Sequence, residues 1–524
     1  MLNLSVVLED AAREQPERDA VVFGDLRLSY AGVDAVANQV ANLLASRGIG
    51  PGDKVALCCP NLPYFPMVYY GVLKAGAVVV PLNMLLQSWE ITYHLDDCDA
   101  RAFFCFEGTP DLPLGERGFT AFQRAVACEH FITLPAPASQ DAGDQNPGGQ
   151  DVGGQYGETL WTALAGLPGT FDTVATEPTE TAVILYGSGT SGRLALGAEL
   201  SHANMVLNAL VTDSMFPRAE HDVYLAALPL FHSFGQTVCM NTGFLRRATL
   251  VLLPRFAPDT ALALMERHRI TFFAGVPTMY WAMLEHPDLG ALDVKRMAAD
   301  LSIAVSGGAA LPGAVLRDFA DRFGVDVLEG YGLSETSPVA AFNRVDRPAK
   351  AGSIGLPIWG VEMKLIDPNW ADIEGPGPGE IAIRGHNVMK GYYNRPDETA
   401  EVLRDGWLRT GDIARRDAEG HYFIVDRSRD LIIRDGVRVY PRDVEEVLIS
   451  HPEVSLAAVA GVPDDALGEE IKAYVVRSRG ATITGETLLS WCAAELPDAW
   501  RPRLVEFRDR LPMTATGKIL KREL

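Results

Sequence analysis

The sequence has little positive charge. Lys and Arg together number 46 against 68 for Asp and Glu, so the formal net charge at pH 7 is −22. Proteins that bind nucleic acids or anionic membranes through their surface usually carry a basic face. The acidic balance therefore argues against DNA, RNA or an anionic membrane as the main partner. It favours a role for the charge in solubility.

The sequence also lacks a long uninterrupted hydrophobic run. The longest stretch, AGAVVVPLNMLL near residues 75–86, contains Pro81 and Asn83 and is too short to cross a bilayer. The start, MLNLSVVLEDAAREQ, turns acidic early and has no basic segment of the kind that opens a secretory signal. We therefore expect no membrane span and a cytoplasmic location.

Cysteine is scarce and irregularly spaced. The number of cysteines is odd and none of them forms a CxxC pair, which predicts reduced, mostly buried thiols. A disulfide framework, a metal site or a catalytic thiol is not indicated. The seven residues are Cys58, Cys59, Cys98, Cys105, Cys128, Cys239 and Cys492.

Helix-like and strand-like segments alternate along most of the chain. Residues 31–47 carry Val and Leu at helical spacing, and Gly48 follows them. The runs KVALCC (54–59) and AVVVPL (77–82) indicate buried strands on either side of a helix. The rhythm returns at 223–230, 249–254, 270–274, 301–305 and 325–328, which is typical of layered α/β architecture.

The expected pattern of secondary structure changes twice toward the C-terminus. From Val361 short strands and turns follow, such as VEMKLID, GEIAIRG and GHYFIVD. After about Asp426 strands alternate with helices, including a helix over 485–495. We therefore predict an α/β fold with a large N-terminal body of several subdomains, residues 1–426, and a small α+β C-terminal domain, residues 427–524. Residues 135–157 are poor in apolar groups, which predicts a surface insertion or a mobile loop.

A loop of Gly, Ser and Thr follows an expected strand at Thr181–Tyr186, within ILYGSGTSGRLALGAELSH (184–202). Its backbone N–H groups and hydroxyls suit an anion, usually a phosphate. The spacing of Gly187, Gly189 and Gly192 matches GxGxxG, but that motif needs a helix directly after the glycines. Here a second strand is expected, and the helix begins only after Ser201.

A Walker-type phosphate loop does not fit either. The pattern GxxxxGK[ST] needs Lys and then Ser or Thr after Gly192, where this sequence has Arg193 and Leu194. The remaining interpretation is a hairpin between two strands, whose tip closes over a triphosphate.

At this point the sequence resembles the adenylate-forming superfamily, which includes acyl-CoA ligases, aryl-CoA ligases, luciferases and adenylation domains of peptide synthetases. The phosphate loop of that family reads approximately [YF]TSGTTGxPKG, and this chain has Tyr186 followed by GSGTSGR. It looks most like actinobacterial fatty-acid or aryl-acid CoA ligases, with a divergent phosphate loop. Further matching stretches follow in the family's order: LPLFHSFG (228–235), SGGAALP (306–312), EGYGLSETSP (329–338), GEIAIRGHNVMKGYYNRPDET (379–399), DGWLRTGD (405–412), DRSRDLI (426–432) and LPMTATGKILKREL (511–524).

The resemblance implies an AMP-forming acid ligase that uses ATP, Mg²⁺ and coenzyme A. A carboxylate would attack the α-phosphate of ATP to give an acyl adenylate and pyrophosphate, and a thiol would then displace AMP. The small C-terminal domain would be mobile and rotate between the two half-reactions. The implied partner is a small-molecule acid, and the oligomeric state, monomer or homodimer, stays open.

The resemblance assigns residues to the phosphates and the metal ion. Glu335 would ligate magnesium, which takes only one or two oxygen ligands from a protein in such sites. Thr336 would touch the α-phosphate, although Ser334 or Thr336 also fits a simple helix cap. The β- and γ-phosphates would be cradled by Ser188, Gly189, Thr190, Ser191 and Gly192.

The resemblance likewise assigns a nucleoside site. Tyr331 would stack on adenine, in a slot formed with Gly308, Ala309 and Gly330. Asp412 would accept hydrogen bonds from both ribose hydroxyls, with Arg427 assisting.

Three further positions carry implied catalytic or mechanical roles. Lys518 would reach the carboxylate and the α-phosphate, although without the resemblance a solvated side chain is the default interpretation of a lysine in such a turn. Arg429 stands at the hinge, where the family usually has Asp or Lys. His232 would lie at the floor of the acyl pocket, although a histidine between two phenylalanines also fits a packed core.

The acyl pocket is expected to be hydrophobic. Its implied residues carry no cation, so the acid would be fatty, cinnamic or a similar aryl acid. They are Phe234, Val238, Gly307, Gly332, Pro338 and Val339.

The chain departs from the family in the phosphate loop and after the hinge, and Gly187 replaces the usual first Thr of the phosphate loop. Leu194-Ala195-Leu196-Gly197 stands where the family has Pro-Lys-Gly, so a lysine that meets phosphate oxygens is missing. Losing such a charged hydrogen bond without replacement weakens ATP binding by about 1.5–3 kcal/mol. After the hinge, RDGVRVYP replaces a loop that normally assists thioester formation, so the CoA step is less strongly implied than adenylation.

Two alternatives remain open at the level of sequence. One is an adenylating enzyme with another acceptor, such as an ATP-dependent diazotase that activates nitrite for an aryl amine. The other is a binding protein without catalysis, and retention of Lys518 argues against it.

Overall fold

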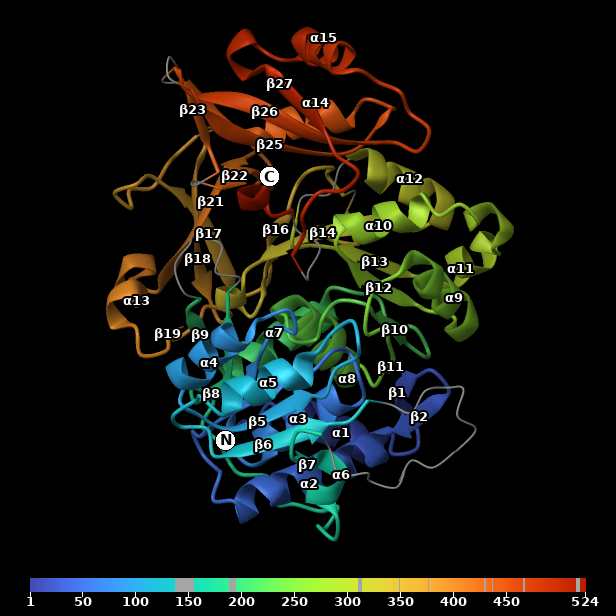
Figure 1. The fold of residues 1–524 in the computed structure, drawn as a ribbon, viewed down its shortest axis with the longest axis vertical. Helices are drawn as coiled ribbons and strands as arrows, with labels where there is room; N and C mark the ends of the chain where they lie inside the picture. Colours follow the sequence, from blue (N-terminus) through green and yellow to red (C-terminus); the bar gives the residue numbers. More distant parts are fainter. Residues whose placement is uncertain are drawn as a thin grey trace.

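The computed structural model describes residues 1–136, 155–187, 195–309, 313–347, 349–375, 377–427, 430–435, 437–464, 467–514 and 519–524. A large body of sheets and helices forms the lower and middle parts of the molecule in Figure 1, and a smaller domain built by the end of the chain lies above it. The predicted α/β fold with a small C-terminal domain is confirmed.

An eight-stranded sheet carries the first half of the body. Its strands, in spatial order, are β19 (Gly391–Tyr392), β9 (Gly197–Ser201), β8 (Thr181–Tyr186), β4 (Val78–Pro81), β3 (Lys54–Cys58), β5 (Ala100–Phe106), β6 (His130–Leu134) and β7 (Glu158–Thr159). In the run β8-β4-β3-β5-β6-β7 each strand is parallel to the next. The pairs β8–β9 and β9–β19 are antiparallel. The helices of this part are α1 (Val6–Glu14), α2 (Tyr30–Ser46), α3 (Tyr64–Lys74), α4 (Ser88–Asp97), α5 (Leu114–Phe122) and α6 (Leu160–Leu164).

A nine-stranded sheet forms the second layer. Its strands, in spatial order, are β16 (Leu356–Pro357), β15 (Val339–Phe342), β14 (Val327–Gly332), β13 (Ile303–Ser306), β12 (Phe272–Gly275), β10 (Val223–Ala226), β11 (Thr249–Leu252), β1 (Asp19–Phe23) and β2 (Leu26–Ser29). The strands from β14 to β1 are parallel. Apart from the second half of β14, most of their residues are buried and apolar, as a sheet covered on both faces requires. Helix α7 (His202–Ser214) leads from β9 of the first sheet to β10. The helical segments between β10 and β15 are the π-helix η1 (Gly235–Asn241), α8 (Thr242–Leu245), α9 (Pro258–His268), α10 (Pro277–Leu284), η2 (Leu289–Ala291), α11 (Val294–Asp300), α12 (Gly313–Phe323) and η3 (Ser334–Thr336).

A smaller antiparallel sheet follows in the chain, at the left of Figure 1. It contains β17 (Val361–Ile366), β18 (Gly379–Gly385), β21 (Trp407–Arg416), β20 (Leu403–Arg404) and β22 (Tyr422–Arg427), with α13 (Pro396–Val402) beside it. The strands predicted at VEMKLID, GEIAIRG and GHYFIVD are thereby confirmed.

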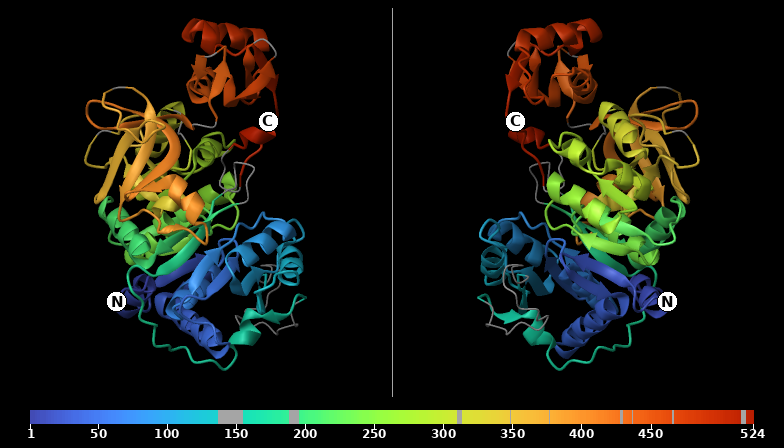
Figure 2. Two further views of the ribbon diagram at one scale, coloured as in Figure 1. Left: turned by 90° about the vertical axis from the view of Figure 1, so that its left-hand side faces the viewer. Right: turned by 90° about the vertical axis from the view of Figure 1, so that its right-hand side faces the viewer.

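The C-terminal domain has a sheet and a hydrophobic core of its own. The sheet consists of β24 (Val437–Val439), β23 (Ile432–Arg434), β26 (Gly468–Arg477), β25 (Val454–Asp464) and β27 (Leu504–Phe507), with α14 (Pro441–Ile449), α15 (Gly485–Glu495), η4 (Asp498–Trp500) and η5 (Lys521–Glu523). Its core begins at Ile432, whereas the core of the body ends at Tyr422. Figure 2 shows this domain standing above the body in both side views. The boundary predicted at residues 426 and 427 falls between the two cores and stays a prediction.

Most local predictions agree with the observed elements. The helix expected over 31–47 is α2, with Val33, Val40 and Leu44 buried, and the helix expected over 485–495 is α15. The seven cysteines are free and buried, as expected. In the part of the chain that the structure describes, no helix is long and apolar enough to cross a membrane. Residues 137–154, most of the expected insertion, lie outside the described ranges.

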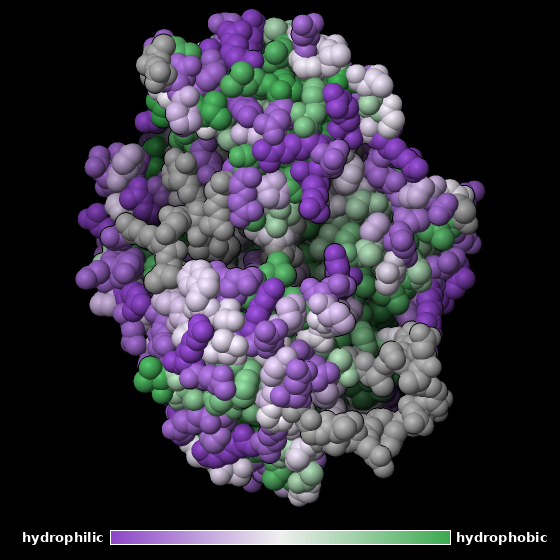
Figure 3. All heavy atoms as spheres, viewed as in Figure 1, coloured by the Kyte–Doolittle hydropathy of each residue, from purple (hydrophilic) through white to green (hydrophobic). Residues whose placement is uncertain are grey.

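The surface mixes polar and apolar residues. On the face in Figure 3, hydrophilic residues cover much of the small domain and the outer edges of the body, with scattered apolar residues between them.

Candidate active site

The glycine-rich loop connects two antiparallel strands. Tyr186 in β8 pairs with Gly197 in β9, and the Gly187 N–H donates to the Leu196 carbonyl at 3.3 Å. Helix α7 begins only after Ser201, whose Oγ accepts from the Asn204 N–H at 3.1 Å. The predicted hairpin followed by a late helix is confirmed, and the dinucleotide and Walker interpretations do not fit this geometry. The tip, which holds Ser188, Gly189, Thr190, Ser191 and Gly192, lies outside the described residues.

Helix α4 supports both ends of this hairpin. The Tyr93 hydroxyl donates to the Ala195 carbonyl at 2.9 Å, and the Tyr186 hydroxyl donates to Oδ2 of Asp97 at 2.7 Å. Arg395 forms an ion pair with the same Asp97 carboxylate. Burial is the largest cause of a raised pKa at Tyr186, so its hydroxyl stays protonated and donates. The sequence analysis missed these supports, because α4 carries no motif of the family.

The turn that carries Glu335 packs against the hairpin strands β8 and β9. The Tyr392 hydroxyl donates to Oε1 of Glu335 at 3.0 Å, and the Met389 N–H donates to the Glu335 carbonyl at 2.9 Å. Burial, followed by the Glu335 carboxylate, raises the pKa of Tyr392, which keeps the phenol protonated as a donor.

The surroundings of Glu335 fit a Mg²⁺ ion that binds together with ATP. Among the described residues no group of three His, Cys, Asp or Glu side chains is placed to hold a metal ion. A single carboxylate such as that of Glu335 is enough protein ligand for Mg²⁺ when substrate phosphates and water complete its shell.

Thr336 is fully buried within the same turn. Its hydroxyl donates to the Pro338 carbonyl at 2.6 Å and accepts from the Leu333 N–H at 2.9 Å. This geometry is that of a cap for η3. Contact between Thr336 and an α-phosphate stays a prediction. For that contact, the hydroxyl would have to give up its hydrogen bond to the Pro338 carbonyl and donate to the phosphate instead.

Tyr331 and Asp412 are brought together from different sheets. The Tyr331 hydroxyl at the end of β14 donates to Oδ2 of Asp412 in β21 at 2.6 Å. Asp412 is only 5% exposed. On the neighbouring strand β22 its Cα partner is Arg427, so the register places the two residues predicted at the ribose opposite each other.

Glu380 in β18 holds the part of β21 that precedes Asp412. Its Oε1 accepts from the Gly411 N–H at 2.9 Å, and its Oε2 accepts from Nε of Arg409 at 2.8 Å. The Asp412 N–H donates to Oγ1 of Thr410 at 3.2 Å. Glu380 lies in the GEIAIRG stretch that the sequence singled out, but its role as a support follows only from these contacts.

The remaining residues of the predicted adenine slot lie at the ends of β13 and β14. Gly308 and Ala309 are exposed directly after β13, and Gly308 has a left-handed φ of +82°. Gly330 lies against Phe342 of β15, and a Cβ at that position would come within 2.3 Å of the Phe342 ring. Only glycine allows this approach of the two strands.

His232 lies in a tightly held loop between β10 and η1. Buried Asn61 donates to the carbonyls of Ala226 and Leu228 at 2.8 Å each and accepts from the Leu230 N–H at 2.9 Å. The half-buried His232 ring accepts at Nδ1 from the Phe234 N–H at 3.2 Å. The π-helix that follows is a conformation frequently found at functional sites.

The residues predicted around the acyl group come from three contacting segments: the start of η1, the end of β13 and the connection from β14 to β15. A Cβ at Gly307 would lie 3.1 Å from the Phe234 ring, so these two residues are neighbours. Gly332 pairs with Val339 across β14 and β15. Oγ1 of Thr237 in η1 donates to the Ser337 carbonyl at 2.8 Å, which ties η1 to this turn. Val238 and Pro338 are buried, and Val339 is 5% exposed.

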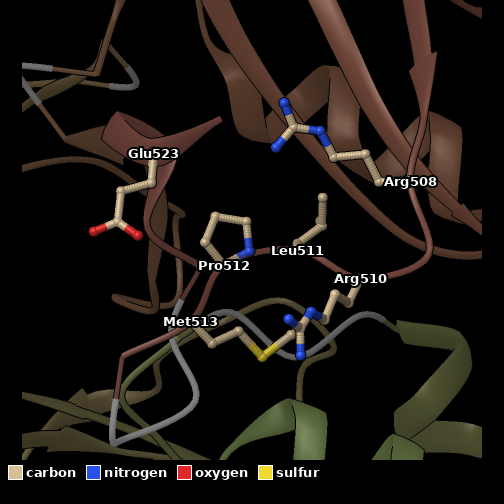
Figure 4. A pocket seen from close by; sticks show the side chains of 6 residues that line it. All are labelled: Arg508, Arg510, Leu511, Pro512, Met513 and Glu523. Atoms are coloured by element: carbon tan, nitrogen blue, oxygen red, sulfur yellow. The ribbon is translucent and has the colours of Figure 1, made fainter. Parts of the chain in front are cut away.

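Besides the tip of the hairpin, two further predicted residues lie outside the described ranges: Arg429, at the expected hinge, and Lys518. A cavity of about 390 Å³ adjoins the segment that leads to Lys518, and Figure 4 shows Arg508 and Glu523 on opposite sides of Leu511 and Pro512. In the divergent stretch RDGVRVYP, Arg434 ends β23 and Val437–Val439 forms the antiparallel partner strand β24.

Comparison with family models decides the classification. A model described as AMP-binding enzyme matches residues 8–393, and one described as AMP-binding enzyme C-terminal domain matches residues 443–518. The chain belongs to the AMP-binding enzyme family. The resemblance to adenylate-forming enzymes is thereby confirmed over most of the sequence.

Relatives of this AMP-binding enzyme include ligases for different acids. It is 34% identical to a long-chain-fatty-acid–CoA ligase of Bacillus subtilis, over 99% of this chain and 94% of that protein. It is 36% identical to a feruloyl-CoA synthase of Amycolatopsis, over 98% of this chain and 96% of that protein.

Solved structures share the fold over the full length. An anthranilate CoA ligase in complex with anthranoyl-AMP aligns with a TM-score of 0.89 and 26% identity, over 99% of this chain and 96% of that one. ATP-bound MatB from Rhodopseudomonas palustris aligns with a TM-score of 0.87 and 31% identity, over 100% of this chain and 98% of that one.

Proposed function

We propose that this AMP-binding enzyme activates a hydrophobic carboxylic acid, fatty or aryl, with ATP and transfers the acyl group to coenzyme A. The observation that carries the proposal is the arrangement around β14 and η3. Within five consecutive residues, Tyr331 reaches the Asp412 carboxylate and Glu335 packs beside the phosphate hairpin. One segment thus adjoins both the expected ribose site and the expected triphosphate site.

In the first half-reaction a carboxylate oxygen of the acid forms a bond to the α-phosphorus of ATP. The bond from that phosphorus to the oxygen bridging to the β-phosphate breaks, and pyrophosphate leaves. Bound Mg²⁺ supplies positive charge against the phosphate oxygens, and Glu335 would hold it. Asp412 orients the ribose, and Lys518 meets the charge that develops on the carboxylate and the α-phosphate.

In the second half-reaction a thiolate sulfur attacks the acyl carbon, and the bond from that carbon to the AMP oxygen breaks. The relatives that use coenzyme A support this acceptor. His232 stands in a fixed loop beside Phe234, at the segment assigned to the acyl group. The apolar residues Phe234, Gly307 and Val339 suit an acid whose body is apolar.

Product analysis by mass spectrometry tests the proposal. The enzyme is incubated with ATP, Mg²⁺ and a mixed panel of fatty and cinnamic acids, with and without coenzyme A. Parallel reactions contain aminoaryl acids and nitrite. We expect AMP, pyrophosphate and an acyl-CoA. AMP together with a diazonium product and no thioester would instead establish the alternative that the divergent loop left open. Absence of AMP from every reaction would contradict adenylation.

A further inference from the structure

Residues 386–393, here called the connector, join the phosphate hairpin to the turn of Glu335. On the hairpin side, the Lys390 N–H donates to the Glu199 carbonyl at 2.9 Å and the Tyr393 N–H donates to the Gly197 carbonyl at 2.8 Å. Glu199 and Gly197 belong to β9, so the connector is an added edge strand of the hairpin. Its position is therefore fixed relative to the strand that leaves the phosphate loop.

On its other side the connector is bonded to η3 and β15. The Met389 N–H donates to the Glu335 carbonyl, and Oγ of Ser337 donates to the Asn387 carbonyl at 2.8 Å. Nδ2 of Asn387 donates to the Val339 carbonyl at 3.0 Å. The backbone around Glu335 is thus tied through the connector to the hairpin, and the spacing between Glu335 and the phosphate loop depends on these bonds.

One side chain of the connector reaches the Glu335 carboxylate itself. The half-buried Tyr392 donates to Oε1 at 3.0 Å, while its own N–H donates to Oγ1 of Thr399 at 2.9 Å. A carboxylate on a short turn rotates about its side-chain torsions, and a hydrogen bond to one oxygen restricts that rotation. Metal ligands commonly depend on such outer hydrogen bonds for orientation.

The neighbouring tyrosine provides a contrast. The Tyr393 hydroxyl donates to Oδ2 of Asp99 at 3.1 Å in an exposed pair, and the Lys54 ammonium lies 5.0 Å from the centre of the Tyr393 ring. Both tyrosines sit on the same edge, but only Tyr392 faces Glu335.

We propose that Tyr392 is a positioning residue, which orients the Glu335 carboxylate toward the Mg²⁺ that accompanies ATP. The inference rests on the proposed function, because it takes Glu335 as the metal ligand. It adds a residue from outside the turn to the magnesium site and makes the connector the element that couples this site to the phosphate hairpin.

Paired substitutions test the proposal, since Tyr392→Phe and Tyr393→Phe remove the same atom from adjacent positions. Binding of α,β-methylene ATP is measured by calorimetry, once with Mg²⁺ and once with EDTA. The Mg²⁺ concentration for half-maximal ATP–pyrophosphate exchange is measured in parallel. We expect Tyr392→Phe to weaken binding about tenfold with Mg²⁺ and to raise the half-saturating Mg²⁺ about tenfold, the effect of one lost hydrogen bond to a charged group. Binding in EDTA is expected to stay unchanged.

The control variants separate the possible failures. Tyr393→Phe should leave both measurements at the wild-type level. If Tyr392→Phe behaves like Tyr393→Phe while Glu335→Gln weakens Mg²⁺-dependent binding, the positioning role is overturned and the metal ligand stands. If Glu335→Gln has no effect on Mg²⁺ dependence, the metal site itself is overturned. Equal weakening by Tyr392→Phe with Mg²⁺ and with EDTA would mean a purely structural role and would also overturn the proposal.

Discussion

The Tyr331 hydroxyl lies 2.6 Å from Oδ2 of Asp412, although 81 positions separate the two residues in the sequence. The bond joins the end of a parallel strand, β14, to the antiparallel strand β21. It orients the carboxylate that is proposed to hold the ribose, and it places the tyrosine ring beside it.

Replacement of Tyr331 by Phe should therefore weaken ATP binding while the ring is retained. We expect the KM for ATP to rise about tenfold, the equivalent of about 1.4 kcal/mol, because Asp412 loses a donor to a charged group. The KM for the acid and kcat should stay within about twofold. Steady-state kinetics with each substrate varied in turn measure this. A lower KM for ATP would show that the hydroxyl competes with the ribose for Asp412.

Replacement of Lys518 by Ala should abolish formation of the adenylate and leave ATP binding largely intact. The reason is that a cation acting on the developing charge contributes mainly in the transition state. ATP–pyrophosphate exchange and equilibrium binding of ATP distinguish the two effects.

The same segment offers a matched control for Lys518. Lys521 forms an ion pair with Glu445 at 2.8 Å, and Lys521→Ala should leave exchange within about threefold of wild type. If Lys518→Ala showed wild-type ATP–pyrophosphate exchange, the assignment of Lys518 as the catalytic lysine would be wrong.

Restoration of the family's Pro-Lys in place of Leu194-Ala195-Leu196 should lower the KM for ATP. A lysine that meets phosphate oxygens contributes about 1.5–3 kcal/mol if nothing else replaces it. The measurement is the KM for ATP at fixed acid concentration.

A substitution that weakens the native loop serves as the comparison for the Pro-Lys replacement. Tyr93→Phe removes the hydroxyl that holds the Ala195 carbonyl in the native loop. We expect it to raise the KM for ATP in the wild-type background. An unchanged KM after restoring Pro-Lys would mean that the present loop already compensates for the missing cation.

Acid should destabilise the fold through His202. This side chain is 1% exposed, its Nδ1 accepts from the Leu4 N–H at 3.0 Å, and burial lowers its pKa from 6.5 to about 4. The unfolded chain therefore takes up a proton at higher pH than the folded one, and the free energy of unfolding falls as pH drops from 6.5 toward 4. The expected loss is on the order of 3 kcal/mol from this group.

Urea unfolding of wild type and of His202→Gln between about pH 7 and about pH 4 measures this contribution. The variant should lose less stability over that range than wild type. Parallel curves for the two proteins would assign the acid sensitivity to other groups.

Local patterns in the sequence determined much of the fold. Apolar periodicity and Gly stops predicted α2, α15 and several strands of both large sheets, because these signals act over a few residues. Two details of the site also followed locally. The second strand after the glycine loop and the helix start at Ser201 exclude two common nucleotide motifs on sequence grounds alone.

The supports of the site were decided by the tertiary structure. Tyr93 and Ala195 are 102 positions apart, and Tyr392 and Glu335 are 57 positions apart, yet each pair is joined by a hydrogen bond. No periodicity or spacing relates such residues, since a hydrogen bond depends on distances that only the packed sheets and helices set. The sequence by itself determined which residue types carry the chemistry and in what order they occur. Only the tertiary structure decided which neighbours hold Asp412, Glu335 and the phosphate hairpin in place.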